Sequence, residues 1–249
     1  MGETMKPFFY IVLLIVAVFI FYYVKNKPNS NRVNGDDKPV NSFRKTAEAR
    51  VFDAKPDMPV GFGYKSQWFV IKAENTDEVA KDLNLTNIQP ANWSTGIEGA
   101  YDGYYFVAPP VRGWTIVANS LMPDMTDPTD ENPLKTIQHL SKKYGEAYYF
   151  GTHRVVDYHA WGRAKNGEII RAYGYLGESD EVLINKGEFT SEELKHNLNY
   201  TDLDNGEANF PDEEHVIILS KEWAIDPRLD YADLGAGVGL AGMKVVPKR

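Results

Sequence analysis

The sequence predicts an α+β protein in which an N-terminal transmembrane helix precedes one domain, built from an antiparallel or mixed sheet with helices packed on one face. Three observations predict this. An uncharged apolar run opens the chain, short aromatic and β-branched segments lie between turn residues, and helix-capping patterns stand between and after those segments. The order strand, helix, hairpin, helix, hairpin, helices is typical of a sheet covered by helices.

The apolar run follows a short leader, residues 1–6, and occupies residues 7–24, PFFYIVLLIVAVFIFYYV. A helix of this length spans about 27 Å, close to the thickness of a hydrocarbon core, so the run predicts a transmembrane anchor. A cleaved secretory signal is the alternative, because Lys6 supplies a positive charge ahead of the run. The run is long for a signal, and no small-x-small cleavage site follows it, which favours the anchor.

Composition separates the rest of the chain into a stalk and a domain. Residues 25–50 are rich in Asn, Lys, Pro and Asp and have almost no large apolar side chain, which predicts a flexible basic stalk. Residues 51–249 are long enough for one core and predict a single soluble domain. Residues 1–50 hold eight of the 27 Lys and Arg and four of the 35 Asp and Glu, which leaves 19 basic and 31 acidic residues in the domain, near −12.

This charge and the absence of cysteine exclude several classes of function. An acidic domain disfavours nucleic acid and fits either a soluble surface or a basic protein partner. Without cysteine there is no disulfide, thiolate zinc site or Cys nucleophile. The glycines of LGAGVGLAG near the C-terminus match a dinucleotide fingerprint, but no strand is expected before them and too few residues follow, so a flexible or closely packed terminal turn is expected. We therefore expect no cofactor and no metal.

The side of the membrane on which the domain lies is open. Lys25, Lys27 and Arg32 follow the apolar run and outnumber Lys6 before it, and this count places the domain in the cytoplasm. A short leader before a long apolar run instead resembles a signal-anchor, which favours an extracytoplasmic domain, in the periplasm or at the cell surface.

Strands are expected mainly in the first two-thirds of the domain. Residues 67–73 predict one strand, and residues 104–109 and 114–119 predict a hairpin. Residues 148–163 form a long β-rich run, and the pair Asn166-Gly167 predicts a type I′ turn that leads into a strand over 169–176.

Helices are expected where capping residues precede apolar residues at helical spacing. Asn75 with a Glu three residues later, Asn132 before a proline, and Thr190 with Glu193 each predict a helix start. Residues 211–224 fit either a helix or a buried strand, and the spacing of their apolar residues favours a helix.

The strand before the Asn-Gly turn carries the candidate catalytic residues. Alternation places Asp157, His159 and Trp161 on one face, and a two-residue turn pairs His159 with Gly174 and Trp161 with Ala172. Small residues opposite two large ones would leave a shallow pocket. An enzyme, a hydrolase that uses His159 and Asp157, is one hypothesis. A structural Asp–His pair is the other.

The other face of this hairpin predicts a binding surface. Tyr and Arg are enriched at protein interfaces because they combine contact area with directional hydrogen bonds. If this face is exposed it binds a partner, and if a helix covers it the aromatic residues are core. The candidate binding residues are Arg154, Tyr158, Arg171, Tyr173, Tyr175 and, from the pocket side, Trp161.

The segments THRVVDYHAWGRA and RAYGYLGE, together with WAIDP at residues 223–227, are similar to a group of uncharacterised bacterial domains, some of which accompany secreted toxins as immunity proteins. The resemblance implies a bacterial source and a protein that binds another protein. On this basis the sequence predicts a membrane-anchored protein-binding module, an immunity protein that neutralises a toxin at the cell envelope. The hydrolase and a structural envelope protein are the alternatives.

Overall fold

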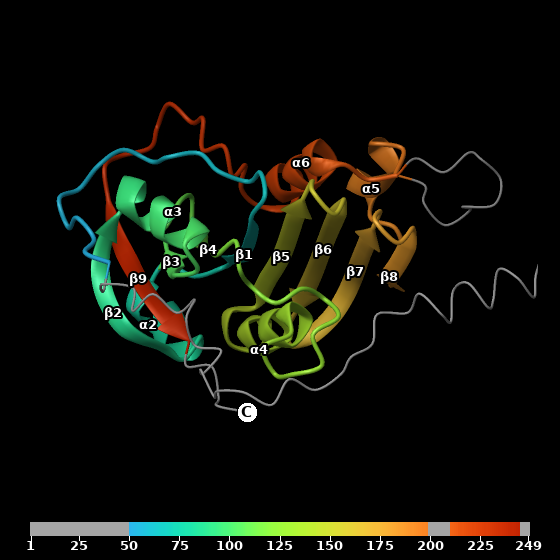
Figure 1. The fold of residues 1–249 in the computed structure, drawn as a ribbon, viewed down its shortest axis with the longest axis horizontal. Helices are drawn as coiled ribbons and strands as arrows, with labels where there is room; N and C mark the ends of the chain where they lie inside the picture. The colour runs from blue at the N-terminus through green and yellow to red at the C-terminus, as the bar shows by residue number, and fades with distance from the viewer. Residues whose placement is uncertain (1–49, 199–209, 245–249) are drawn as a thin grey trace, which may run out of the picture. The chain divides into compact units, whose positions relative to one another are not determined.

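The computed structural model describes residues 50–198 and 210–244, which belong to one compact unit, Ala49–Arg249. These residues form one nine-stranded sheet in the order β2-β9-β3-β4-β1-β5-β6-β7-β8 (Figure 1), and every neighbouring pair is antiparallel. The strands are β1 Gln67–Ile71, β2 Leu85–Asn92, β3 Tyr105–Val107, β4 Thr115–Ala118, β5 Glu146–His153, β6 Tyr158–Lys165, β7 Glu168–Leu176, β8 Glu181–Lys186 and β9 Val238–Lys244.

Short helices cover both faces of this sheet (Figure 1). The helices among the described residues are α2 Thr76–Asp82, α3 Trp93–Tyr101, α4 Pro133–Tyr144, α5 Ser191–Lys195 and α6 Glu213–Trp223. Apolar residues of α3 and α6 pack into the core on one face, which we call the α6 face. Apolar residues of α2 and α4 pack into the core on the other, which we call the α4 face.

The predicted fold class was therefore wrong in its architecture. The domain is mostly sheet, and its helices lie on both faces instead of one. The central strand β1 shows why, because Trp68 and Val70 point into the core of the α6 face while Phe69 and Ile71 point into that of the α4 face. All four side chains are buried, and a strand that is apolar on both faces requires cover on both.

The prediction of a single-pass membrane protein is also contradicted. Within residues 50–198 and 210–244, no helix has both the length and the apolar character needed to cross a bilayer. The segments predicted as leader (1–6), anchor (7–24) and all but the last residue of the stalk (25–50) lie outside the described residues.

Several local predictions were confirmed. Asn75, Asn132 and Thr190 each cap a helix through their side chains, and Thr190 forms a full capping box with Glu193. Residues 213–223 form a helix, α6, as the apolar spacing favoured. The hairpin of β3 and β4 is present as well.

The glycine-rich C-terminal segment was predicted wrongly as a turn, because it forms strand β9 inside the sheet, between β2 and β3. Its glycines permit close packing. A Cβ on Gly239 would lie 2.2 Å from the carbonyl oxygen of Val107, so only glycine fits that position without a shift of the backbone. The same glycines that lower strand propensity therefore allow this strand to enter the sheet.

Candidate binding surface

The hairpin that carries the predicted site residues differs from its prediction in two places. Residues 154–157 form a turn between β5 and β6, with Asp157 at φ 53°, so the long β-rich run is two strands. The Asn166-Gly167 turn is present, and both residues have positive φ, 50° and 87°, as a type I′ turn requires. Beyond the turn, a bulge between Arg163 and Ala164 shifts the pairing of β6 and β7 by one residue.

This shift rearranges the predicted faces. His159 lies opposite Tyr175 and Trp161 opposite Tyr173, so the pocket expected over Gly174 and Ala172 is not formed. A one-residue slip moves a whole strand segment to the other face of a sheet. Arg171, Tyr173 and Tyr175 consequently share the α6 face with Trp161, whereas Tyr158 packs on the α4 face.

Helices and loops bury most of the predicted binding residues. Tyr158, Trp161, Arg171, Tyr173 and Tyr175 are all buried, and only Arg154 of the predicted set is exposed. These side chains therefore form core contacts, such as the 4.9 Å ring contact between Trp161 and Tyr173, which is the second of the two alternatives given for this face.

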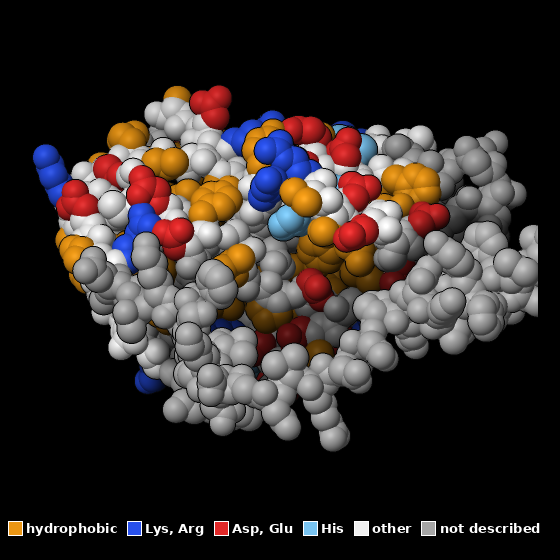
Figure 2. Space-filling view, viewed as in Figure 1, with side chains coloured by type: hydrophobic (Ala, Val, Ile, Leu, Met, Phe, Trp, Pro, Cys, Tyr) orange, Lys and Arg blue, Asp and Glu red, His pale blue; other side chains and the backbone are white. Residues whose placement is uncertain are grey.

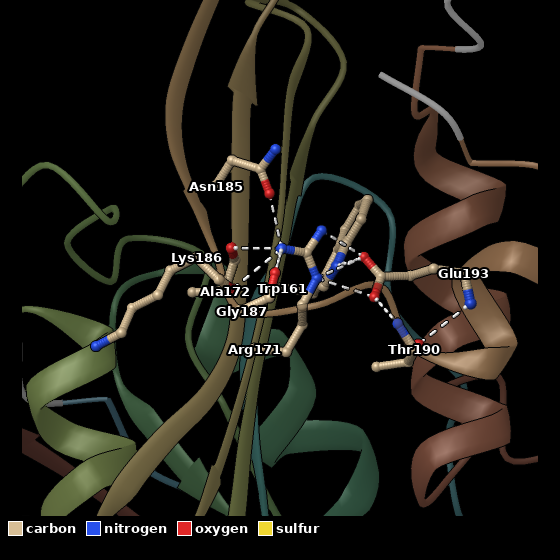
Figure 3. A network of polar contacts seen from close by, with 8 residues as sticks. All are labelled: Trp161, Arg171, Ala172, Asn185, Lys186, Gly187, Thr190 and Glu193. Carbon is tan, nitrogen blue, oxygen red and sulfur yellow. Dashed lines mark hydrogen bonds and ion pairs between the residues drawn. The ribbon is translucent and has the colours of Figure 1, made fainter. Parts of the chain in front are cut away.

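A buried ion pair joins Arg171 to Glu193 of α5, and a hydrogen bond joins Trp161 to the same carboxylate (Figure 3). The Arg171 guanidinium contacts both carboxylate oxygens of Glu193, with Nε at 2.9 Å from each and Nη2 at 2.8 Å from Oε1. Glu193 also accepts the indole N–H of Trp161 at 3.0 Å and the backbone N–H of Thr190 at 2.8 Å. The other side of the guanidinium donates to Asn185 Oδ1 at 2.7 Å.

The side chains of Arg171 and Glu193 are 1% and 0% exposed, so both charged groups are shielded from solvent. Buried charges persist in proteins only when they are paired and hydrogen-bonded, and here the network supplies both conditions. The arrangement holds α5 against β7 and β8 and leaves no room for a ligand between the partners. We interpret it as structural.

The predicted catalytic pair is formed but enclosed. The imidazole of His159 has its Nε2 2.7 Å from Oδ1 of Asp157, and the ring is buried while the carboxylate of Asp157 is more than half exposed. The backbone N–H of Gly177 donates to the carbonyl of Asp157 at 3.0 Å. The pair therefore fixes the β5–β6 turn against β6, and the backbone hydrogen bond joins that turn to the β7–β8 turn, an arrangement that fits the structural alternative of the two hypotheses.

Within the described residues, no group of three or more His, Asp or Glu side chains is placed to hold a metal ion. No nucleophile forms a hydrogen bond with His159 there. Residues 50–198 and 210–244 thus place an acid–base pair there without a metal site or a hydrogen-bonded nucleophile.

An exposed surface that the sequence did not predict lies at the end of the sheet where β1 begins and β4 and β5 end. Five exposed side chains from two loops, the β5–β6 turn and the end of α3 form it, and we call it the sheet-end patch: Tyr64, Tyr101, Leu121, Arg154 and Val155. Figure 2 shows hydrophobic, basic and histidine side chains next to one another above the β5–β6 turn.

Hydrogen bonds hold the elements of the sheet-end patch together. The hydroxyl of Tyr101 donates to the carbonyl of Tyr64 at 2.8 Å, and Ser120 donates to the carbonyls of Ala100 and Tyr101 at 3.1 and 3.2 Å. The backbone N–H of Thr152 donates to the carbonyl of Ser66 at 2.9 Å, which brings the β5–β6 turn beside the loop of Tyr64.

Charged groups behind the patch fix Tyr64. Its hydroxyl donates to Glu214, and this hydrogen bond, followed by burial, raises the pKa of Tyr64 above its ordinary value. Arg228 lies 3.7 Å from Glu214 and binds the carboxylate of Asp226 through two nitrogens, at 2.9 and 2.8 Å. Tyr64 therefore stays a neutral hydroxyl at physiological pH and is held in one place.

The WAIDP segment supports this loop directly. The backbone N–H of Phe62 donates to the carbonyl of Pro227 at 2.9 Å, and a Cβ on Gly61 would lie 2.4 Å from the carbonyl oxygen of Arg228. Residues 223–228 thus position the exposed Tyr64. No pattern of alternation or capping marks Tyr64, Tyr101 or Leu121, because two loops and the end of α3 bring them together.

No protein-family model matches this chain, and neither do curated proteins or solved structures.

Proposed function

We propose that this domain is a protein-binding module that contacts its partner through the sheet-end patch. The observation that carries the proposal is the exposure of large apolar side chains on an ordered surface: Tyr64 is 41% exposed, Tyr101 42%, Val155 68% and Leu121 71%. Contiguous exposed apolar residues beside polar ones are typical of protein interaction sites, and Tyr and Arg are the residues most enriched there.

The order of the patch favours binding because little conformational entropy is lost when a partner docks. Tyr101 and Tyr64 are joined by a hydrogen bond, and Tyr64 is fixed from behind by Glu214. Two tyrosines in fixed positions, with an arginine and two aliphatic side chains beside them, can supply the buried centre of an interface.

The partner that the charge favours is a basic protein. The domain carries about twelve more acidic than basic side chains, with 31 Asp and Glu against 19 Lys and Arg in residues 51–249. Such a charge accelerates encounter with a positive partner and disfavours nucleic acid. The resemblance to toxin-immunity domains suggests which partner this is. We propose that the domain inhibits a secreted toxin by binding to its surface.

We do not propose the hydrolase that uses His159 and Asp157. The imidazole is enclosed, and the described residues place no nucleophile at hydrogen-bonding distance from it.

Binding can be tested with the full chain and the protein encoded next to it, followed by affinity capture if that protein does not bind. Replacement of both Tyr101 and Leu121 by Ala should weaken a stable complex at least about tenfold, which is the effect of losing central apolar contacts. Leu194→Ala is the matched control, because Leu194 is also exposed but lies on α5, outside the patch. Equal affinities of the wild type, the double variant and Leu194→Ala for the partner would contradict the proposed surface. No stable partner at physiological salt would contradict the function.

A further inference from the structure

We propose that β8 is a self-association edge, at which two copies of this chain pair their β8 strands antiparallel about a twofold axis and join their sheets into one. This inference concerns the β8 edge of the sheet, outside the sheet-end patch, and does not depend on the proposed function.

β8 is the last strand of the sheet (Figure 1). Among the described residues, β7 is its only strand neighbour, and no backbone hydrogen bond from a turn or loop reaches its outer side. The strand, EVLINK, contains no proline that would block pairing. Its outward N–H and C=O groups are therefore available to a further strand.

A bulge in β8 places its two end charges on one face. The register with β7 shifts between Gly174 and Tyr175, and Leu183 is the extra residue in β8. In a regular strand, residues five apart point to opposite faces. The extra residue cancels this, so Glu181, opposite Leu176, and Lys186, opposite Ala172, both point to the α4 face.

This arrangement makes β8 complementary to itself. In an antiparallel pair centred on Leu183 and Ile184, Glu181 of one copy lies opposite Lys186 of the other, and the reverse pair forms at the other end. The apolar residues Leu183 and Ile184 meet in the middle on the α4 face, where they are only half-buried within one copy. Opposite charges directly across an antiparallel pair stabilise it, and like charges destabilise it.

The end charges also lack an oppositely charged partner among the described residues of one copy, where Glu181 only accepts a hydrogen bond from the hydroxyl of Ser179 at 3.5 Å. Neither Glu181 nor Lys186 forms an ion pair with another described residue, and both are exposed. A twofold dimer would pair each Glu181 with Lys186 of the other copy and so form two ion pairs. This match between the two ends of the same strand favours a second copy over an unrelated strand.

The test is a charge exchange on the full chain, read out by sedimentation velocity over about a hundredfold range of concentration. The wild-type chain should dimerise. Glu181→Lys and Lys186→Glu should each weaken dimerisation at least about tenfold, because each places two like-charged pairs in the interface. An equimolar mixture of the two variants should restore a dimer, since every cross-strand pair is then of opposite charge.

Restoration in the mixture distinguishes this interface from association elsewhere in the chain, and matching circular dichroism of the variants shows that they fold. A monomeric wild type overturns the proposal. So does a dimer that both single variants retain, or a mixture that stays as monomeric as its components.

Discussion

The two edges of the sheet are built differently. At the β2 edge the register shifts between Thr86 and Gln89, Asn87 has a positive φ of 52°, and Pro90 lacks an N–H. The chain just before β1 covers part of this edge, because the backbone N–H of Asn92 donates to the carbonyl of Asp53 at 2.7 Å. The β8 edge has its own bulge but no proline, and among the described residues no chain lies hydrogen-bonded along it.

This difference determines how far strand pairing can extend. A sheet with two open edges can add copies at both and grow into a fibre, whereas one with a single open edge closes after two copies. The register shift and the proline in β2 therefore hinder strand pairing at that edge. The bulge in β8 instead places the end charges of the strand where a second copy can pair with them. The three substitutions below test how each side of the sheet is held, from the largest expected effect to the smallest.

Glu193→Ala should destabilise the β8 side of the sheet and lower the unfolding free energy. It leaves the Arg171 guanidinium buried without its counterion, and removal of one partner of a buried pair costs about 3–5 kcal/mol. Urea unfolding monitored by tryptophan fluorescence measures this loss. Glu192→Ala, in the same helix but not buried, should change the unfolding free energy by less than about 0.5 kcal/mol. Equal losses for the two variants would mean that the ion pair does not hold this side of the sheet.

Gly239→Ala should disturb the β2 side by a smaller amount. The new methyl group would approach the carbonyl oxygen of Val107 to 2.2 Å, and overpacking of this kind costs about 1–3 kcal/mol. Gly235→Ala is the control, because a Cβ there would have no atom within 4 Å. Thermal unfolding should separate the two variants, and indistinguishable melting temperatures would contradict the close approach of β9 to β3.

Asp82→Asn should weaken the contact between α2, beneath the β2 side, and α4, beneath the β8 side. Burial raises the pKa of Asp82, but hydrogen bonds from Lys143 at 2.7 Å and Tyr144 at 2.6 Å outweigh it and lower the pKa overall. Lys143 is half exposed, so solvent screening limits the expected loss to about 0.5–1 kcal/mol at neutral pH.

The sign of the pH dependence follows from the lowered pKa. The ionised carboxylate stabilises the folded state above the unfolded pKa of about 3.9, and this contribution disappears as the pH falls through the lower folded pKa. The difference in unfolding free energy between wild type and Asp82→Asn should thus shrink on acidification from pH 7. A constant difference would show that charge plays no part.

Features with a local cause were predictable from the sequence. The caps at Asn75, Asn132 and Thr190 and the turn at Asn166-Gly167 depend on side chains within three residues of one another. The Arg171–Glu193 pair was missed because it has no such local cause. Its partners lie 22 residues apart and meet only after β8 and α5 have folded.

Features that depend on partner strands were not predictable. The bulge at Arg163 and Ala164 has no signature in its sequence, yet it reverses the face of every residue from Arg171 onward in β7. The turn at residues 154–157 contains neither Gly nor Pro and reads as continuous strand. Because of these two errors, the sequence placed Tyr158 on the same face as Tyr173 and Tyr175, whereas the structure buries them on opposite faces of the sheet.

The Arg171–Glu193 pair also has a consequence for local opening. A helix of five residues has no stability of its own in water, and helix ends usually exchange their amide protons by fraying. Glu193 is both the N3 residue of the α5 capping box and the buried counterion, so α5 cannot unwind without exposing an unpaired charge. The amide proton of Leu194, bonded to the carbonyl of Thr190 at 3.1 Å, should then exchange only when the whole sheet unfolds.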